Sequence, residues 1–460
     1  MIKSYDWIVI GSGPGGFVAS TELSKKYSVL LIEKGGIPNS NKYSSEISIN
    51  ELYDDISVVK SQSPFGFGQG SCLGGGSVVN GALFWPLPIH TENHWRKEFG
   101  DKFVDDIKDN YSFYKSLLNV STDSVKIGNK DSLVMKAAAE KLGWKVVPVP
   151  RALNNCELNN NCGFGCESKV SLDKLYSKYN DINIKVNSNV SKIIMKKSKA
   201  IGVTLTSGEN IYVKKGIIVA AGALNSHSIL KSSNIKSKSF PQFHINLKFV
   251  VEHTDELNSS YGTMFTHQVQ EFIDDKMLVM PTNFSRKSLL SSTLHLNKND
   301  RKYIFNNRKK CGIYVLQLQP ATVGKIKRIF GKDYFFYQLN DNDFDLIFKS
   351  VRRTIHLLKN AGFKKIVIPS KKLNKLFNLE TFDESIINNV FNWDFISVHG
   401  MSANRIGKSP NDSICNTEGL VHNTSNVFVS DSSCLPSNIG ESPQGVIMSN
   451  AKRIVDQINL

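Results

Sequence analysis

Three glycines near the start of the 460-residue chain have the spacing of a phosphate-binding loop. Gly11, Gly13 and Gly16 form the pattern G-x-G-x-x-G, with Ser12 inside the loop. Gly11 allows the tight turn, Gly13 lets the backbone approach a pyrophosphate, and Gly16 lets a helix pack closely on a strand. Glu33 stands about 20 residues further on, where a carboxylate accepts hydrogen bonds from a ribose diol and disfavours a ribose phosphate. These residues predict a site for FAD or NAD.

The elements needed to hold this loop lie on both sides of it in the sequence. Residues 6–10 are a short apolar run typical of a buried strand, residues 17–23 are typical of a helix, and residues 29–32 form a second strand. Because the helix begins at the loop, its positive N-terminal end is expected to face the phosphates. The glycine pattern alone would be weak evidence for a nucleotide site. The order of strand, loop, helix and strand makes the prediction specific.

The composition indicates a globular protein. Hydrophobic residues make up 40% and charged residues 21% of the chain, and no apolar stretch approaches the ~20 residues that a membrane helix needs. The N-terminus lacks a signal-peptide pattern, and the seven cysteines lack the spacing of a disulfide scaffold. A cytoplasmic location is therefore expected.

The net charge of +16 comes from scattered lysines, many of them beside asparagines. No nucleic-acid-binding module is recognisable, so no nucleic-acid partner is expected. A short basic run at residues 325–328 is the exception. It leaves open a contact with an anionic partner, such as a membrane surface or an acidic glycan.

A second glycine-rich segment, residues 73–84, resembles a segment of the glucose–methanol–choline (GMC) oxidoreductase family. In that family the segment runs along the FAD pyrophosphate and past the isoalloxazine ring. The resemblance assigns FAD contacts to Gly75, Gly76, Ser77 and Asn80, and free N–H groups in such a turn can bind phosphate or flavin carbonyl oxygens. Some members attach FAD through a histidine in this turn. None is present in this turn, so the FAD is expected to be bound non-covalently.

Two further stretches resemble nucleotide-binding parts of the same family. Residues 189–194 resemble the strand that passes the adenine, which assigns a contact to Val190. Residues 217–226 resemble the family's second signature, in which small residues such as Ala221 let the chain pass close to the nucleotide. A proline that usually follows this signature is replaced by His227.

The catalytic block of the family is matched by residues 399–407 and 427–436. His399 stands at the position of the family's catalytic histidine, and imidazole suits a base because its pKa lies near working pH. Asp431 matches an acid that holds the ribityl chain or the flavin. The resemblance implies hydride transfer from an alcohol carbon to flavin N5, with His399 as base.

One catalytic position departs from the family pattern. A second His or Asn is usual just before a proline in the final loop, and Ser442 occupies that place before Pro443. A hydroxyl can hydrogen-bond a substrate alcohol or His399, but it cannot replace an imidazole base. Ser442 and Pro443 fit equally well as the N-cap and first residue of a last helix over 443–458. In the family, the N-terminal end of this helix faces the flavin.

A cysteine trio leaves two alternatives open. Cys156, Cys162 and Cys166 have the spacing Cys-x5-Cys-x3-Cys, and thiolates this close can bind an iron–sulfur cluster or zinc. The spacing is similar to that of membrane-associated GMC dehydrogenases whose three cysteines hold a three-iron cluster. Residues 162–166 also resemble a loop of the long-chain alcohol oxidases, for which free buried thiols are the expectation.

The predicted fold is α/β, with a doubly wound, Rossmann-like FAD-binding domain built from discontinuous segments. An inserted α+β substrate domain is expected to contain an antiparallel sheet and a helix over 343–361. The expected domains are FAD-binding at 1–90, 182–241 and 393–460, a cysteine-containing connecting segment at 91–181, and substrate-binding at 242–392.

The resemblance implies a dehydrogenase or oxidase for an alcohol, polyol or sugar. The electron acceptor is left open between oxygen, a quinone and a redox protein. The same framework also hosts a cyanohydrin lyase and a fatty-acid decarboxylase, which are non-redox alternatives. Ser442 motivates a third alternative, a flavin-binding protein without turnover.

Overall fold

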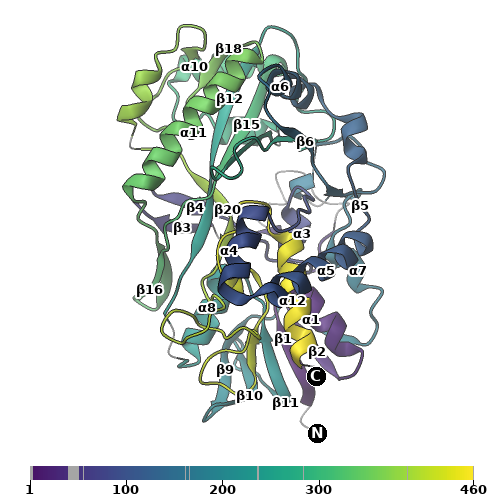
Figure 1. Cartoon of the computed structure of the whole chain (residues 1–460). Coiled ribbons are helices and arrows are strands. Elements are labelled where there is room, and N and C mark those ends of the chain that lie inside the picture. The colour runs from purple at the N-terminus through teal and green to yellow at the C-terminus, as the bar shows by residue number, and fades with distance from the viewer. Residues whose placement is uncertain are drawn as a thin grey trace.

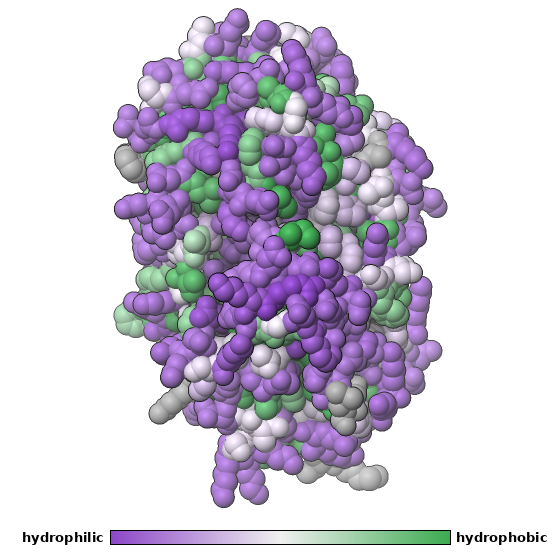
Figure 2. Space-filling view, viewed as in Figure 1, coloured by the Kyte–Doolittle hydropathy of each residue, from purple (hydrophilic) through white to green (hydrophobic). Residues whose placement is uncertain are grey.

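The computed structural model describes residues 4–39, 51–54, 56–160, 162–164, 166–235, 238–282, 284–390 and 392–458. Two large sheets form an elongated molecule, and helix α12 (Gln444–Ile458) lies where the two parts meet (Figure 1). No helix of the described residues is long and apolar enough to cross a membrane. Figure 2 shows hydrophilic side chains over most of one face, with apolar side chains scattered among them.

The first sheet contains the strands predicted around the glycine loop. Among the described residues its strand order is β8-β2-β1-β11-β10-β9, with β21 beside β11. Strands β8, β2, β1, β11 and β21 are parallel, and β10 and β9 continue antiparallel. The bounds are β1 (Ser4–Ile10), β2 (Val29–Ile32), β8 (Ile182–Lys185), β9 (Val190–Lys196), β10 (Lys199–Leu205), β11 (Asn210–Val219) and β21 (Val427–Val429).

Strand β1 lies at the point where the strand order reverses, with β2 on one side and β11 on the other. In such sheets a ligand binds beyond the carboxyl end of the strand at this point. Both faces are buried, as is usual for parallel strands. Trp7 and Val9 pack into one core, whereas Ile8 and Ile10 pack into the other.

The second sheet is mostly antiparallel. Among the described residues its order is β16-β17-β3-β4-β20-β12-β15-β14-β13-β6, with β18 beside β12 and β19 beside β18. The bounds are β3 (Ser57–Lys60), β4 (Phe65–Phe67), β6 (Val146–Pro148), β12 (Gln242–His253), β13 (His267–Val269), β14 (Met277–Pro281), β15 (Cys311–Leu318), β16 (Lys325–Ile329), β17 (Lys332–Phe336), β18 (Phe363–Val367), β19 (Phe377–Asn378) and β20 (Ile396–Met401). β5 (Val120–Ser121) and β7 (Arg151–Ala152) pair separately.

Strand β12 positions the site because its two faces have different chemistry. Its odd-numbered residues from 243 to 251 are apolar and pack into the core under the sheet. The alternate side chains His244, Asn246 and Lys248 point to the opposite face. β12 pairs with β20 and β15 on its two sides, so polar side chains from three strands meet there.

Helices cover both sheets. α11 has a capping box at Asn340 and Asp343 and buries Ile347, Val351 and Ile355 against the second sheet. The helix predicted over 343–361 is therefore present. The bounds are α1 (Pro14–Ser24), α3 (Gly76–Val79), α4 (Ile89–Phe99), α5 (Asp101–Leu117), α6 (Lys130–Lys141), α7 (Leu172–Tyr176), α8 (Ala223–Ser232), α9 (Arg286–Ser291), α10 (Lys298–Asn306), α11 (Asp341–Asn360) and α12 (Gln444–Ile458).

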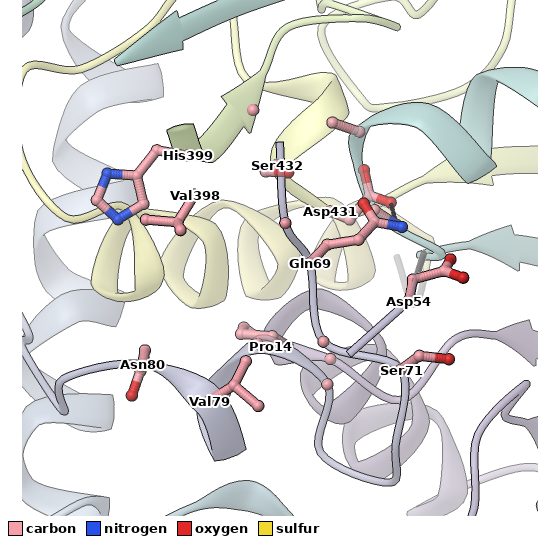
Figure 3. A pocket seen from close by; sticks show the side chains of 18 of the residues that line it. Pro14, Asp54, Gln69, Ser71, Val79, Asn80, Val398, His399, Asp431 and Ser432 are labelled. Carbon is pink, nitrogen blue, oxygen red and sulfur yellow. Dashed lines mark hydrogen bonds between the residues drawn. The ribbon is translucent and has the colours of Figure 1, made fainter. Parts of the chain in front are cut away.

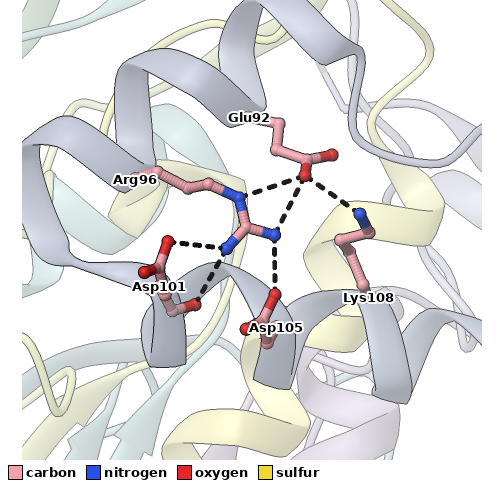
Figure 4. Close-up of polar contacts among 5 residues, drawn as sticks. All are labelled: Glu92, Arg96, Asp101, Asp105 and Lys108. Carbon is pink, nitrogen blue, oxygen red and sulfur yellow. Dashed lines mark hydrogen bonds and ion pairs between the residues drawn. The ribbon is translucent and has the colours of Figure 1, made fainter.

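An ion-pair cluster joins α4 to α5, the helix that packs on α12 (Figure 4). Arg96 pairs with Glu92 at 3.0 Å, with Asp101 at 3.0 Å and with Asp105 at 2.6 Å. Lys108 contacts the same Glu92 oxygen at 2.9 Å. Exposed ion pairs contribute little to stability, so the cluster chiefly fixes the angle between the two helices.

The predicted α/β class with a second, antiparallel sheet is confirmed. β3 and β4, within the expected segment 1–90, pair in the second sheet, and so does β20 from the expected segment 393–460. The expected domain bounds themselves stay a prediction. Strands from widely separated segments share this sheet because pairing depends on edge hydrogen bonds rather than on order along the chain.

Candidate active site

A cavity of about 580 Å³ lies between the loops at the carboxyl end of β1 and the polar face of the second sheet. Its wall includes both glycine-rich segments, the end of β11, strands β12, β15 and β20, and the start of α12. His399, Val398 and Asn80 lie at one end, and Asp54 and Ser71 lie at the other (Figure 3). The cavity therefore connects the predicted nucleotide loop with the predicted catalytic histidine.

The first glycine loop is built by close backbone contacts. Gly11 has φ +95°, and a Cβ added there would lie 2.3 Å from the Ala220 carbonyl oxygen. A Cβ at Gly16 would lie 1.8 Å from the Gly11 carbonyl oxygen. A Cβ at Gly13 would meet nothing within 4 Å, although Gly13 lines the cavity. Packing thus requires Gly11 and Gly16, whereas Gly13 borders open space.

The second glycine segment lies against the first. Gly75 has φ +52°, and a Cβ there would lie 2.8 Å from Gly13 Cα. The Gly74 N–H donates to Ser12 Oγ at 3.0 Å, which ties the two loops together. A Cβ at Gly76 would meet nothing within 4 Å. Two bare backbones therefore border one space, the arrangement that a pyrophosphate requires.

Ser77 supports this segment from behind. Its hydroxyl donates to the Gly74 carbonyl at 2.8 Å and accepts from the Leu172 N–H at 3.0 Å. Ser77 and Gly16 are absent from the residues that line the cavity. Their roles in the described structure are to shape the loops.

Glu33 is held at the end of β2 by the glycine loop. The Ser12 N–H and hydroxyl donate to Glu33 Oε2 at 3.0 and 2.6 Å, and the Gly35 N–H donates to Oε1 at 2.8 Å. Burial raises the pKa of this carboxyl, and the hydrogen bonds oppose the shift. Glu33 lines the cavity at the nucleotide end, where a ribose diol would compete for these acceptors.

Asp431 lines the middle of the cavity and organises three loops. The Gly222 N–H and Ser226 hydroxyl donate to Oδ2 at 2.7 and 2.5 Å. The Ser433 N–H donates to Oδ1 at 2.8 Å. Both carboxylate oxygens already accept hydrogen bonds. Asp431 therefore shapes the wall of the cavity by holding Gly222, Ser226 and Ser433 in place.

The final helix starts one residue later than predicted. It begins at Gln444, and the Pro443 carbonyl accepts from the Ile447 N–H at 2.9 Å. Pro443 is therefore at the N-cap position, and the reading of Ser442 as N-cap is wrong. The Ser442 hydroxyl lines the cavity and makes no hydrogen bond within the described residues. Asn80 Nδ2 donates to Gln444 Oε1 at 2.5 Å, which joins the second glycine segment to α12.

His399 has a histidine partner that the sequence did not indicate. In the register of β12 and β20, His244 lies opposite His399. Their Nδ1 atoms are 3.1 Å apart. His244 is fully buried, and its Nε2 accepts from the Gly440 N–H at 2.9 Å.

These contacts determine where the protons lie. A backbone N–H can only donate, so His244 Nε2 is an acceptor and its proton is on Nδ1. His244 Nδ1–H then donates to His399 Nδ1. The proton of neutral His399 is therefore on Nε2, the nitrogen left for the cavity. This assignment follows from the hydrogen-bond partners, as tautomers usually must.

Both imidazoles are held neutral. Burial lowers the pKa of His399 to about 4. Burial also holds the pKa of His244 well below its usual range, and the neighbouring His399 and His90 add to this effect. At neutral pH neither ring carries an extra proton that it would have to release to solvent before it could accept one.

The period of β12 was the signal that could have revealed His244. Polar residues at 244, 246 and 248 alternate with large apolar residues, as expected for a strand with one face on a core and the other on a polar space. What the pattern could not supply was the partner, since His244 and His399 are 155 positions apart.

The cysteine trio does not form a metal centre. Among the described residues, no group of three His, Cys, Asp or Glu side chains could hold a metal ion. Cys156 Sγ lies 2.5 Å from Thr263 Oγ1, whereas Cys162 Sγ accepts from Arg151 Nη2 at 3.0 Å. A hydrogen bond from Cys166 lowers the pKa of the Cys162 thiol, helped by the charge of Arg151. An iron–sulfur cluster is thus unsupported.

The geometry agrees with the comparison to known proteins. The model of the N-terminal part of GMC oxidoreductases matches residues 6–252, and the model of the C-terminal part matches residues 332–451. The chain belongs to the GMC oxidoreductase family. This GMC oxidoreductase is thus a member of a family of FAD-binding enzymes, and the oxidoreductase class predicted from the sequence is confirmed.

Relatives of this GMC oxidoreductase are distant. An uncharacterized GMC-type oxidoreductase from Sinorhizobium fredii is 22% identical over 98% of this chain and 94% of its own. A long-chain-alcohol oxidase from Arabidopsis thaliana is 26% identical over 97% of this chain and 67% of its own. The present chain therefore spans about two thirds of the plant enzyme.

Solved structures share the fold of this GMC oxidoreductase. A pyridoxine 4-oxidase from Mesorbium loti has a TM-score of 0.75 and 13% identity, and covers 99% of each chain. A formate oxidase variant from Aspergillus oryzae, solved to study modification of its FAD, has a TM-score of 0.74 and 10% identity over 99% of this chain and 98% of its own.

Most residues assigned to the site from the sequence meet at one cavity. Its lining includes Gly11, Ser12, Gly13, Glu33, Gly75, Gly76, Asn80, Val190, Ala221, His399, Asp431, Ser442 and Pro443. Their contacts with FAD and substrate stay predictions, as do the cytoplasmic location and the electron acceptor.

Proposed function

We propose that this GMC oxidoreductase oxidises the CH–OH group of a small-molecule alcohol, with non-covalently bound FAD and with His399 at the reacting oxygen. The observation that carries this proposal is that His399 and Ser442 line the same cavity as both glycine segments. When bound, FAD supplies the acceptor for the hydride of the alcohol carbon. The electrons then leave to an acceptor that the cavity does not identify.

The chain fits FAD at the nucleotide end of the cavity. Gly13 and Gly76 border open space on facing loops, so they would hold the pyrophosphate. Glu33 would accept from the adenine-side ribose. The N-terminal end of α12 carries the positive end of the helix dipole and lines the cavity through Gln444, where it would favour negative charge on the cofactor.

His399 is proposed to take the hydroxyl proton at Nε2. For Nε2 to accept, the proton that His399 carries at rest must move to Nδ1. The hydrogen bond between the two rings then reverses: His399 Nδ1–H donates, and His244 Nδ1 accepts. That change leaves the Gly440 N–H without its acceptor, at a cost of about 1–3 kcal/mol. At rest, Nε2–H can instead orient the substrate oxygen.

The function is tested by anaerobic absorbance of the purified protein with sugars, polyols and long-chain alcohols. Flavin bands that one alcohol class bleaches would support the proposal. Flavin that no alcohol bleaches would favour a non-redox reaction or a protein without turnover, with Ser442 the first position to restore to His or Asn. A colourless protein that FAD does not reconstitute would overturn it.

The pH dependence of the flavin reduction rate reports the state of His399. A base must be neutral, and burial lowers the pKa of His399 to about 4. We expect the rate to be flat near neutral pH and to fall as the pH drops through about 4. Stopped-flow measurements between pH 4 and 8 check this, with retained flavin as the control for folding. A fall near pH 6.5 would contradict the buried site.

His244 is proposed as a positioning residue that acts through His399. Its N–H donates to His399 Nδ1, which opposes protonation of His399. His244→Phe should therefore move the acidic limb of the pH profile of flavin reduction upward. His244→Asn, which keeps a donor, should leave the limb in place. If both variants keep the original limb, the role of His244 is structural.

A further inference from the structure

Lys248 is a cation in the wall of the cavity that the reaction at His399 does not use. It lines the cavity, and no hydrogen bond or ion pair of its side chain is found within the described residues. Burial lowers the pKa of Lys248, and the charge of Asp394, which is outside the cavity lining, partly opposes this. Lys248 is only partly exposed, and an ammonium withdrawn from water without a paired anion is costly unless a ligand supplies one.

The position of Lys248 follows from strand register. His244, Asn246 and Lys248 are successive residues on one face of β12. Lys248 is four positions after His244 in the strand, which corresponds to ~13 Å between their Cα atoms. Lys248 therefore lies at a different part of the cavity from the reacting oxygen.

The wall beside Lys248 is apolar. Val315 of β15 lies opposite Lys248, and Met280 of β14 lies opposite Val315. Closer to His399, Asn246 lies between Ile396 of β20 and Gln317 of β15, and all three line the cavity. A ligand that reaches from His399 to Lys248 would therefore pass two amide side chains before it reaches the hydrocarbon side chains beside Lys248.

Asn246 supplies a second unpaired group. Its side chain is 7% exposed, and Oδ1 has no hydrogen-bond partner within the described residues. Asn246 lines the cavity between His244 and Lys248. A buried amide oxygen without a partner is unusual, which indicates that a donor group of a ligand completes the site.

We propose that the substrate is an alcohol that also carries a carboxylate, and that Lys248 binds the carboxylate. The inference rests on the proposed function and deepens it. Lys248 is then a specificity-determining residue, which orients the substrate so that the hydroxyl end reaches His399. Uncharged sugars and polyols, which lack the anion, are expected to be poor substrates.

The test compares ω-hydroxydecanoate with decanol as reductants of the flavin. In the unaltered protein, KM for the hydroxy acid should be lower by about 10- to 100-fold, the range for a charge-assisted hydrogen bond. Lys248→Met should remove this difference and leave KM for decanol within about threefold. Lys248→Arg should keep most of the preference. Lys364→Met, which removes an exposed lysine on β18, is the matched control and should change neither.

The outcomes separate the two proposals. Equal KM values in the unaltered protein, or a loss of both substrates in Lys248→Met, would overturn the role of Lys248 while alcohol oxidation stands. If no alcohol reduces the flavin, the binding of decanoate, measured by equilibrium dialysis, tests the carboxylate site independently of the reaction. Saturable binding that Lys248→Met weakens would support the carboxylate site, and an absence of saturable binding would overturn it.

Discussion

His399→Ala is expected to lower the rate of flavin reduction by an alcohol about 100- to 10,000-fold, the contribution of a positioned acid–base group. The reason is that Ser442, which also lines the cavity, cannot hold a proton near neutral pH as imidazole does. The measurement is anaerobic stopped-flow absorbance with a saturating alcohol.

His422→Ala is the matched control for this loss. His422 is half-buried outside the cavity lining and contacts Ser413 Oγ at 3.0 Å. Its replacement should leave flavin reduction unchanged. Flavin content and thermal unfolding should be similar in the two variants. If His399→Ala reduces its flavin at the normal rate, His399 has no part in proton transfer.

Gly13→Val is expected to weaken FAD binding by at least about 100-fold, which corresponds to ~3 kcal/mol. The protein has room for the side chain, because a Cβ there would meet nothing within 4 Å. The side chain would extend into the space between the two glycine segments, where the pyrophosphate is proposed to lie. Equilibrium dialysis with FAD on the refolded apoprotein gives the affinity.

Gly16→Val distinguishes loss of the ligand space from loss of the fold. A Cβ at Gly16 would lie 1.8 Å from the Gly11 carbonyl oxygen, and backbone cannot move away as a flexible side chain can. This variant should lose FAD and also unfold at lower temperature. Gly13→Val should keep the melting temperature of the apoprotein. Normal FAD affinity in Gly13→Val would place the pyrophosphate elsewhere.

The local sequence was sufficient to predict the nucleotide-binding loop. The turn at Gly11, helix α1 and strand β2 are neighbours along the chain, so short-range constraints specify them. Glu33 could be placed because it ends a strand that pairs with β1. The final helix was also predictable from its apolar spacing, although its start was one residue off because capping depends on the loop before it.

Residue identity also indicated where proton chemistry could occur. His399 was found by the resemblance of its segment, and the model places it in the wall of the cavity. Spacing misled in the case of Cys156, Cys162 and Cys166. Short intervals allow thiols to meet, but the structure turns Cys156 toward Thr263 and Cys162 toward Arg151.

The sequence by itself determined the family, the glycine loop and a histidine that is predicted to be catalytic. Only the tertiary structure decided that His244 fixes the proton of His399, that Ser442 lines the cavity rather than capping a helix, and that Lys248 lines the same cavity. For His244 and Lys248 the physical reason is strand register. β12, β15 and β20 come from distant parts of the chain, and a shift of one residue would turn each of these side chains to the other face.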